Sequence, residues 1–278
     1  MNEKELTLII ITFNSKEVIG KCLEFIGSGK YDIIVVDNAS SDGTADFIKA
    51  AFPEVKLINS PKNLGYGRAA DLGLKSVNTK YSLLLNPDVI TSAETIEDLL
   101  GRAKTYPDAA IFAPLTQKEK KGSAPVQKVE WVSGAVMLFD MEKLARIGFF
   151  DENIFLFYEE TDLCKRARDK GFEIILFNDI YFRHLVGGSS LPNDKITYLK
   201  YWHMSWSRFY YNKKHKKTAE FLRTTSGYLL KFTLKYLIYI FSGNKEKKIK
   251  YKASLAGGVS YLTGLKAFDE NGNPRGSK

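Results

Sequence analysis

Residues 83–88 read Leu-Leu-Leu-Asn-Pro-Asp, an apolar run that ends at an Asn, a Pro and a carboxylate. This pattern predicts a buried strand that delivers Asp88 to the edge of a sheet. Residues 33–38, Ile-Ile-Val-Val-Asp-Asn, repeat the design and deliver Asp37. Open α/β sheets bind ligands just beyond the carboxyl ends of their strands, so two acids placed there predict a site for a nucleotide and a metal ion.

Segments typical of strands and of helices alternate on both sides of this stretch. Apolar, β-branched runs predict strands at 6–12, 31–37, 55–59 and 81–85, and amphipathic runs predict helices at 15–25, 44–51, 67–77 and 91–104. After Pro107 the pattern loosens, with strands expected at 131–139, 173–177 and 180–183 and helices at 141–148 and 159–170. The alternation predicts an α/β fold, with a mainly parallel sheet covered by helices on both faces.

Length and composition are those of a folded protein. The chain has 278 residues, of which 44% are apolar and 26% charged, enough for one large domain or a domain with an appendage. Cys22 and Cys164 fit neither a disulfide framework nor a metal-binding pair, and the charged start Met1–Glu5 lacks the features of an export signal. We therefore expect a cytoplasmic protein.

Glycine-rich phosphate loops are missing from their usual positions. A dinucleotide-binding Rossmann domain would carry G-x-G-x-x-G after its first strand, where this chain has Phe13-Asn14-Ser15-Lys16. Gly65 and Gly67 come only after the third strand, without a third glycine three residues on, and there is no P-loop. We expect the sheet to bind its nucleotide by other means.

Six blocks of sequence follow one another in a recognisable order. They are Thr12-Phe13-Asn14, residues 35–44 (Val-Val-Asp-Asn-Ala-Ser-Ser-Asp-Gly-Thr), residues 63–67 (Asn-Leu-Gly-Tyr-Gly), residues 85–88 (Leu-Asn-Pro-Asp), residues 131–135 (Trp-Val-Ser-Gly-Ala) and residues 158–164 (Tyr-Glu-Glu-Thr-Asp-Leu-Cys). Together they resemble the family 2 inverting glycosyltransferases with the GT-A fold, in the branch often called rhamnosyltransferase-like. The resemblance implies a GT-A catalytic domain, a Rossmann-like mixed sheet, over residues 1–191.

The resemblance also implies roles for residues at the strand ends. Asp88 stands where the family carries the last acid of its Asp-x-Asp metal motif, Asn86 replaces the first acid, and His184 stands where relatives place a His near the metal or the diphosphate. The implied cofactor is Mn²⁺ or Mg²⁺, held by hard oxygen ligands. The residues implied in binding the nucleotide sugar are Thr12, Asn14, Asp37, Asn38, Gly65, Asn86 and Gly134. Arg68 stands where relatives often have a small or amide residue, and we expect it either to contact phosphate or to form a surface ion pair.

Two acids are candidates for the chemistry itself. Inversion needs a base that removes the proton of the acceptor hydroxyl. Residues 159–162, Glu-Glu-Thr-Asp, resemble the family block Glu-Asp-x-Asp, whose second acid is the usual base, so Glu160 is the implied base. Its side chain is longer than that of the usual Asp, and Glu159 remains an alternative. We expect structural roles for Asp162, in the first turn of a helix, and for Asp42, at a helix cap.

Residues 192–278 form a basic, helical tail. Between Lys195 and Lys252 fifteen Lys or Arg residues stand against two Glu residues, which is more than the whole net charge of +9. The apolar stretch 228–241 is shorter than the ~20 residues that a membrane span needs, and predicts an amphipathic helix lying on an anionic membrane. A dimerisation helix pair and a helix packed on the body remain alternatives. No motif for nucleic-acid recognition accompanies the tail.

The resemblance implies an enzyme that extends a bacterial surface polysaccharide at the inner face of the cell membrane. Asp37 would accept the N3–H of uracil or thymine, which favours a UDP or dTDP donor; dTDP-rhamnose is the leading donor, and a lipid-linked glycan or oligosaccharide the acceptor. A UDP-hexose transferase of the same fold is one alternative. A catalytically silent relative that binds glycan or acts as a scaffold is the other, because Asn86 and Glu160 depart from the family pattern.

Overall fold

The computed structural model describes residues 4–27, 29–116, 124–185 and 193–276, and these form two compact units. The first unit comprises Met1–Asp151 and Glu160–Ser190. The second comprises Leu191–Lys278 together with the short segment Glu152–Glu159. The domain boundary expected at residue 191 lies outside the described residues.

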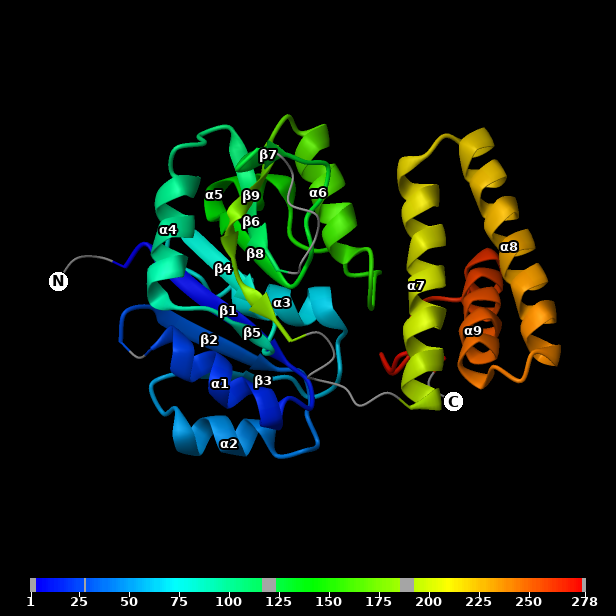
Figure 1. The fold of residues 1–278 in the computed structure, drawn as a ribbon, viewed down its shortest axis with the longest axis horizontal. Coiled ribbons are helices and arrows are strands. Elements are labelled where there is room, and N and C mark those ends of the chain that lie inside the picture. Colours follow the sequence, from blue (N-terminus) through cyan, green and yellow to red (C-terminus); the bar gives the residue numbers. More distant parts are fainter. Residues whose placement is uncertain (1–3, 28, 117–123, 186–192, 277–278) are drawn as a thin grey trace. The chain divides into compact units, whose positions relative to one another are not determined.

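Eight strands form the central sheet of the first unit, in the order β3-β2-β1-β4-β8-β6-β9-β7 (Figure 1). Strands β3, β2, β1 and β4 are mutually parallel, as are β6 and β9, whereas β8 runs antiparallel to β4 and β6, and β7 to β9. The mixed, mainly parallel sheet expected from the sequence is confirmed. The strands are β1 (Leu6–Thr12), β2 (Asp32–Asp37), β3 (Lys56–Asn59), β4 (Tyr81–Leu85), β6 (Ala109–Leu115), β7 (Val126–Lys128), β8 (Val136–Asp140) and β9 (Glu173–Tyr181).

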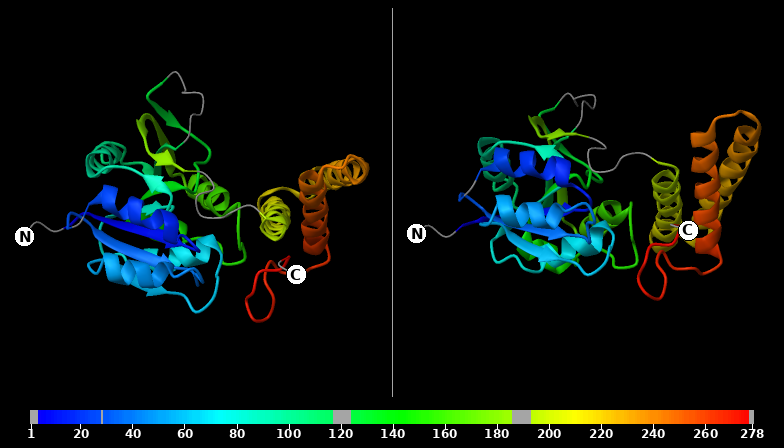
Figure 2. Two further views of the ribbon diagram at one scale, coloured as in Figure 1. Left: turned by 60° about the horizontal axis from the view of Figure 1, so that its bottom comes forward. Right: turned by 90° about the horizontal axis from the view of Figure 1, so that it is seen from below.

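Helices cover both faces of this sheet, as Figures 1 and 2 show. The apolar side chains of β1 explain its continuous hydrophobic run, because Leu8 and Ile10 pack into the core on one face while Ile9 and Ile11 pack into the core on the other. The first face carries α1 (Lys16–Ile26), α2 (Thr44–Ala51) and α4 (Ala93–Ala103), and the second carries α3 (Tyr66–Leu74), α5 (Met141–Ile147) and α6 (Glu159–Asp169).

The second half of the sheet corrects three sequence expectations. The sequence does not predict β6, whose Ala-rich run contains Pro114. The strand expected at 131–139 begins only at Val136, because residues 131–133 are irregular and Gly134 and Ala135 form a turn. The strands expected at 173–177 and 180–183 are one strand, β9, with a shift of register against β6. A two-residue strand, β10 (Arg183–His184), follows it and pairs with β5 (Val89–Ile90).

Three long helices make up most of the second unit: α7 (Asp194–His215), α8 (Thr218–Phe241) and α9 (Lys245–Leu262). Helices α7 and α9 pack closely because α9 carries Gly257, where a Cβ atom would lie 2.1 Å from the carbonyl oxygen of Trp202. The aromatic core of this unit includes Trp202, Trp206 and Phe155 from the short segment. Among the described residues, no helix combines the length and the apolar character that a membrane crossing requires.

Candidate active site

The carboxyl ends of β1 and β2 bring Thr12 and Asp37 together. The two residues are partners in the parallel ladder, and Thr12 Oγ1 donates a hydrogen bond of 3.0 Å to Asp37 Oδ1. The other oxygen, Oδ2, accepts from the backbone N–H of Ser40 at 3.0 Å. The carboxylate is therefore fixed in direction at the edge of the sheet where the sequence predicts the nucleotide, and each oxygen keeps one lone pair for another donor.

Asn14 links the loop after β1 to the loop after β2. Its Oδ1 atom accepts from the backbone N–H of Ser41 at 2.8 Å, and its own N–H donates to Ser40 Oγ at 2.8 Å. Asp42 accepts hydrogen bonds from the backbone N–H groups of Lys16 and Thr44, the structural role expected from the sequence. Asn14 thus shapes the loops around Asp37, and the structure gives it this role in addition to any contact with a ligand.

Asn38 organises the loop that precedes α3. Its Oδ1 atom accepts from the N–H of Leu64 at 2.8 Å, and its Nδ2 atom donates to Asn63 Oδ1 and to the carbonyl of Gly65. Both amide hydrogens are used within the protein, so the side chain acts as a brace for the loop. Gly65, at φ 81°, occupies a backbone conformation that favours glycine and is the N-cap of α3.

Helix α3 connects this loop to the turn before β8. The hydroxyl of Tyr66 donates to the carbonyl of Gly134 at 2.7 Å, and Nε of Arg68 donates to the carbonyl of Leu64 at 2.7 Å. Tyr66 was not predicted as a site residue, although it lies in one of the blocks that resemble the family. A Cβ atom on Gly134 would lie 3.6 Å from Cβ of Glu160, which places Glu160 beside this turn.

Asp88, Asn86 and His184 converge at the end of β4. Nε2 of His184 lies 3.1 Å from Oδ1 of Asp88 and 3.4 Å from Nδ2 of Asn86. The pairing of β5 with β10 causes this approach, because it places His184 opposite Val89, the neighbour of Asp88. The backbone N–H of Asn86 donates to Ala135 at 2.9 Å, which joins the group to the Gly134 turn.

This group has the chemistry of a partial cation site. Asp88 is 2% exposed, and its Oδ1 atom accepts no hydrogen bond of good geometry from the described residues although it faces His184. Within the described residues no group of three or more His, Cys, Asp or Glu side chains is arranged so that it could hold a metal ion. Asp88 and His184 would therefore supply one oxygen and one nitrogen ligand, which fits an ion whose remaining ligands are diphosphate oxygens and water.

Glu160 and Glu159 begin α6, and their surroundings differ. Burial raises the pKa of the Glu160 carboxyl above its usual range, and Oε1 accepts from the hydroxyl of Thr161 at 3.1 Å. A raised pKa suits a carboxylate that must take up a proton. Asp162, fully buried, forms an ion pair of 2.7 Å with Arg166 Nε, the structural role expected for it. Burial raises the pKa of the Cys164 thiol to about 12, which disfavours its thiolate.

Strained backbone is concentrated in the loops that carry these residues. Among the described residues, the non-glycine residues with positive φ are Asn14, Ala39, Phe157 and Tyr158, with φ between 52° and 71°. Asn14 and Ala39 lie in the two loops around Asp37. Phe157 and Tyr158 directly precede Glu159. Such conformations cost on the order of 1–3 kcal/mol each and persist where the surroundings enforce them, typically at functional sites.

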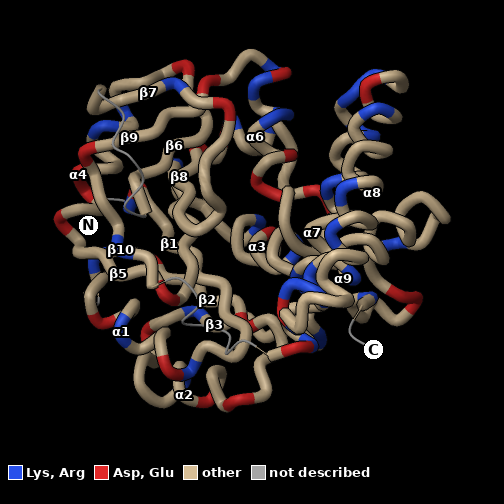
Figure 3. Tube along the Cα trace, turned by 45° about the vertical axis from the view of Figure 1, so that its right-hand side comes forward, with Lys and Arg blue, Asp and Glu red and all other residues tan. Residues whose placement is uncertain are grey.

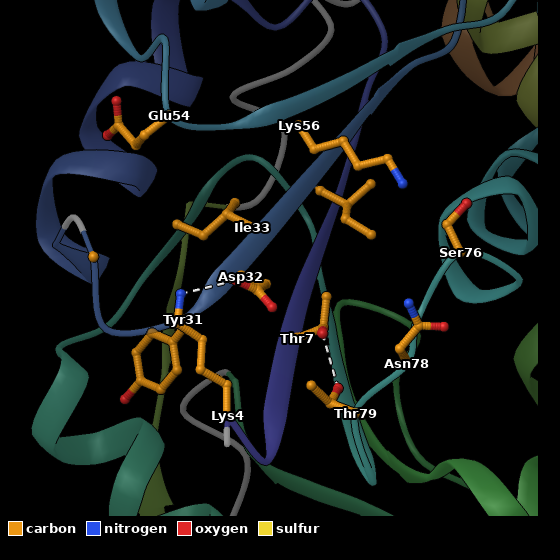
Figure 4. A pocket seen from close by; sticks show the side chains of 12 residues that line it. Lys4, Thr7, Tyr31, Asp32, Ile33, Glu54, Lys56, Ser76, Asn78 and Thr79 are labelled. Atoms are coloured by element: carbon orange, nitrogen blue, oxygen red, sulfur yellow. Dashed lines mark hydrogen bonds and ion pairs between the residues drawn. The ribbon is translucent and has the colours of Figure 1, made fainter. Parts of the chain in front are cut away.

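A hollow at the opposite end of the sheet contains none of these residues (Figure 4). It lies at the amino-terminal ends of β1 and β2, where Lys4 and Asp32 form an ion pair of 2.8 Å and Thr7 bonds to Thr79. Because parallel sheets bind ligands at the carboxyl ends of their strands, this hollow does not belong to the candidate site.

Residues 7–168 match the family described as glycosyl transferase family 2. The chain belongs to glycosyltransferase family 2. The matched segment contains every residue of the candidate site except His184. The family and the GT-A fold predicted from the sequence are confirmed; the roles of the individual site residues stay predictions.

Individual relatives are distant from this family 2 chain. It is 25% identical over 202 residues to a low-salt glycan biosynthesis hexosyltransferase of Haloferax volcanii, a match that covers 61% of the chain and 64% of the relative. It is 22% identical over 189 residues to an N-acetylglucosaminyl-diphospho-decaprenol L-rhamnosyltransferase of Mycobacterium tuberculosis, covering 50% of the chain and 62% of the relative. The matches therefore span less than two thirds of these relatives.

Solved structures share the fold at lower identity. A mannosyltransferase of Pyrobaculum calidifontis in complex with GDP-Man and Mn²⁺ superposes with a TM-score of 0.63 at 13% identity, covering 93% of this chain and 87% of that one. TarS of S. aureus in complex with UDP gives a TM-score of 0.55 at 13% identity, covering 94% and 92%. Both matches extend beyond the family 2 segment into the helical unit.

Proposed function

We propose that this family 2 chain is a metal-dependent inverting glycosyltransferase that extends a bacterial surface polysaccharide. The observation that carries the proposal is the meeting of Asp88, His184 and Asn86 at the end of β4, joined through the Gly134 turn to Glu160. The neighbouring strand ends add Asp37 for the base of the nucleotide. A cation ligand, a candidate base and a nucleotide-binding edge thus lie on one side of the sheet, as the transfer of a sugar from a nucleotide diphosphate requires.

The proposed reaction is a single in-line displacement. The acceptor hydroxyl loses its proton to Glu160, and its oxygen forms a bond to the anomeric carbon of the donor while the bond to the diphosphate oxygen breaks on the opposite side. The configuration at that carbon is therefore inverted. Asp88 and His184 would hold the divalent cation, which when bound offsets negative charge on the departing diphosphate. The mannosyltransferase with a similar fold was solved with Mn²⁺, which supports this cofactor.

The proposed donor is a dTDP or UDP sugar, with dTDP-rhamnose first and a UDP-hexose second. Asp37 supports this choice, since each of its oxygens can accept one further N–H and uracil and thymine offer N3–H while cytosine does not. The M. tuberculosis relative is named as a rhamnosyltransferase acting on a diphospho-decaprenol lipid, which supports rhamnose and a lipid-linked acceptor.

A panel of nucleoside diphosphates tests the role of Asp37. With Mn²⁺ present, dTDP and UDP should raise the Tm of the full chain, and CDP should raise it less. Asp37→Asn should reduce this difference, because the amide can also donate to the acceptor N3 of cytosine. GDP belongs in the panel because guanine also offers N–H donors. Equal stabilisation by all pyrimidine diphosphates would contradict recognition of the base by Asp37.

Turnover separates an enzyme from a silent glycan-binding relative. The full chain, incubated with nucleotide sugars and Mn²⁺, should release nucleoside diphosphate in the presence of a lipid-linked glycan. If diphosphates bind but no donor turns over, the chain is the scaffold alternative.

We further propose that the second unit holds the protein at the inner face of the membrane. The outward face of α8 carries an apolar stripe at intervals of three or four residues, consisting of Leu230, Leu234, Leu237, Ile238 and Phe241. Phe241 is 87% exposed, and three exposed lysines follow it closely, Lys245, Lys247 and Lys248. No acid occurs between Glu220 and Glu246, and Lys and Arg mark all three helices in Figure 3. An anionic bilayer fits this combination, whereas a second copy would bring like charges together.

Vesicle binding tests this surface in the full chain. The chain should co-sediment with phosphatidylglycerol vesicles and less with neutral vesicles. Changing Lys245, Lys247 and Lys248 to Gln should weaken binding on the order of 10²-fold at low salt, from about 1 kcal/mol per lysine. Phe241→Gln should weaken the part of vesicle binding that persists at high salt. Phe25→Gln, which removes an exposed Phe from α1, is the matched control. Equal vesicle binding by the Phe241→Gln and Phe25→Gln variants would contradict insertion of α8 into the bilayer. If the full chain instead forms a dimer that Phe241→Gln dissociates, the exposed stripe of α8 serves self-association.

A further inference from the structure

One face of α7 holds the loop that leads into the proposed base. His203, Ser207, Arg208 and Tyr211 follow one another at spacings that place them on the same side of the helix. All four contact residues 155–158, which belong to the second unit although Glu160 begins the return of the chain to the first. Helix α7 therefore contacts the segment of chain that directly precedes Glu160, the candidate base.

Two hydrogen bonds fix this loop to α7. The hydroxyl of Ser207 donates to the carbonyl of Leu156 at 2.9 Å, and Nε of Arg208 donates to the hydroxyl of Tyr158 at 2.8 Å. The ring of Tyr211 lies 5.5 Å from that of Tyr158 between centroids. One bond restrains the backbone of the loop and the other restrains a side chain two residues from Glu160.

Ring packing completes the contact. The imidazole of His203 lies 4.6 Å from the ring of Phe155, and burial lowers the pKa of His203 to about 3, so this residue packs as a neutral ring. The guanidinium of Arg208 lies 5.8 Å from the centroid of Tyr158 and 4.4 Å from that of Tyr228 on α8. A planar guanidinium can stack on a ring and donate through Nε at once, which a lysine ammonium cannot reproduce.

The loop that α7 contacts, residues 155–158, also contains strained backbone. Phe157 and Tyr158 adopt φ values of 65° and 71°, which are unusual for bulky side chains. A backbone held in such conformations relaxes unless its surroundings prevent this. The hydrogen bonds from Ser207 and Arg208 hold Leu156 and Tyr158, the residues on either side of Phe157.

We propose that Arg208 is a positioning residue, which holds the turn at Phe157 and Tyr158 and thereby sets the position of Glu160 at the start of α6. The inference rests on the proposed function, since it assigns the base to Glu160. It gives α7 a part in catalysis apart from any part in membrane attachment. Arg208 would act through Tyr158 and would contact no reacting atom.

Three variants of the full chain test the proposal: Arg208→Gln, Arg208→Lys and Tyr158→Phe. Each should lower kcat on the order of 10- to 10²-fold while the donor KM stays near that of the wild type, because the base moves and the nucleotide edge does not. Arg208→Lys should retain little more kcat than Arg208→Gln, because the lysine ammonium lacks the planar guanidinium group. The double variant Arg208→Gln with Tyr158→Phe should be no worse than Arg208→Gln alone, because both remove the same contact. Arg223→Gln, which removes the same charge from an exposed site on α8, is the matched control.

Hydrogen exchange gives a readout that does not depend on activity. In the Arg208 and Tyr158 variants, the amides of residues 155–161 should exchange faster, with α9 unchanged. The pH at which kcat is half maximal should also fall, because a looser loop admits water and lessens the burial that raises the pKa of Glu160.

The outcomes separate this proposal from the assignment of the base. Faster exchange with lower kcat supports the proposal. Wild-type kcat in Arg208→Gln and Tyr158→Phe, with or without faster exchange, overturns it. A loss of kcat that is accompanied by a higher donor KM and faster exchange in α9 also overturns it, because the effect is then a general loss of structure. If Glu160→Gln is fully active, the base assignment fails independently of how these variants exchange.

Discussion

Glu160→Gln is expected to lower the rate of sugar transfer by about 10²–10⁴-fold while the binding of the donor persists. The amide keeps the size of the side chain and can still accept from Thr161, but it cannot take up the proton of the acceptor hydroxyl. Since burial raises the pKa of Glu160, the wild-type kcat should rise with pH through a value above the usual range of Glu and then level off. Steady-state kinetics between pH 4 and 9 would show whether the variant loses this limb of the profile.

Stability measurements separate a chemical loss from a folding defect. A carboxyl whose pKa is raised in the folded state lowers stability as pH rises through its unfolded pKa, and the full cost is present above the folded pKa. Glu160→Gln removes this cost, so its Tm at neutral pH should equal or exceed that of the wild type. Glu159→Gln is the control from the adjacent position. A crippled Glu159→Gln beside an active Glu160→Gln would move the base by one residue.

The strands that carry Asp37 and Asp88 could be predicted because burial on both faces leaves a plain trace in sequence. β2 and β4 are continuous apolar runs, and each ends at the polar residues that reach the edge of the sheet. The convergence of these ends follows from parallel pairing with β1, which the alternation of strands and helices implies. Structural roles for Asp42 and Asp162 were also predictable, since turn and first-turn preferences are local, although the N-cap of α2 is Gly43 and not Asp42.

Strands β6 and β9, in the half of the sheet that contains the antiparallel pairings, were less predictable from the sequence. β6 contains three alanines and Pro114, which disfavour a strand, yet its neighbours bury it completely. β9 continues past the polar pair Asn178-Asp179 because a shift of register against β6 accommodates these residues, and Asn178 bonds to the carbonyl of Ala124. Tertiary contacts thus overrode local preference in both strands.

The candidate site was likewise predictable only in part from the sequence. That Asp88 would reach the edge of the sheet is a local prediction, but its approach to His184 depends on a two-residue ladder between segments far apart in sequence. No periodicity in the sequence signals so short a pairing. The bond from Arg208 to Tyr158 and the positive φ of Tyr158 were likewise invisible, since both arise where a loop meets a helix.

Asp88→Asn is expected to remove most of kcat and to abolish the stimulation of turnover by Mn²⁺. Asp88 is the one carboxylate among the three side chains that meet at the candidate cation site in the part of the chain that the structure describes, Asp88, His184 and Asn86, so Asp88→Asn removes the formal negative charge that these side chains supply. A nitrogen ligand also favours Mn²⁺ over Mg²⁺, which prefers oxygen ligands. His184→Gln should therefore raise the concentration of Mn²⁺ needed for half-maximal turnover more than that of Mg²⁺. Titration of both ions against release of nucleoside diphosphate measures this, with Asp98→Asn on the exposed face of α4 as the matched control. Near-wild-type transfer by a folded Asp88→Asn protein in EDTA would exclude a cation held by Asp88, and equal shifts for the two ions in His184→Gln would exclude His184 as a ligand that discriminates between them.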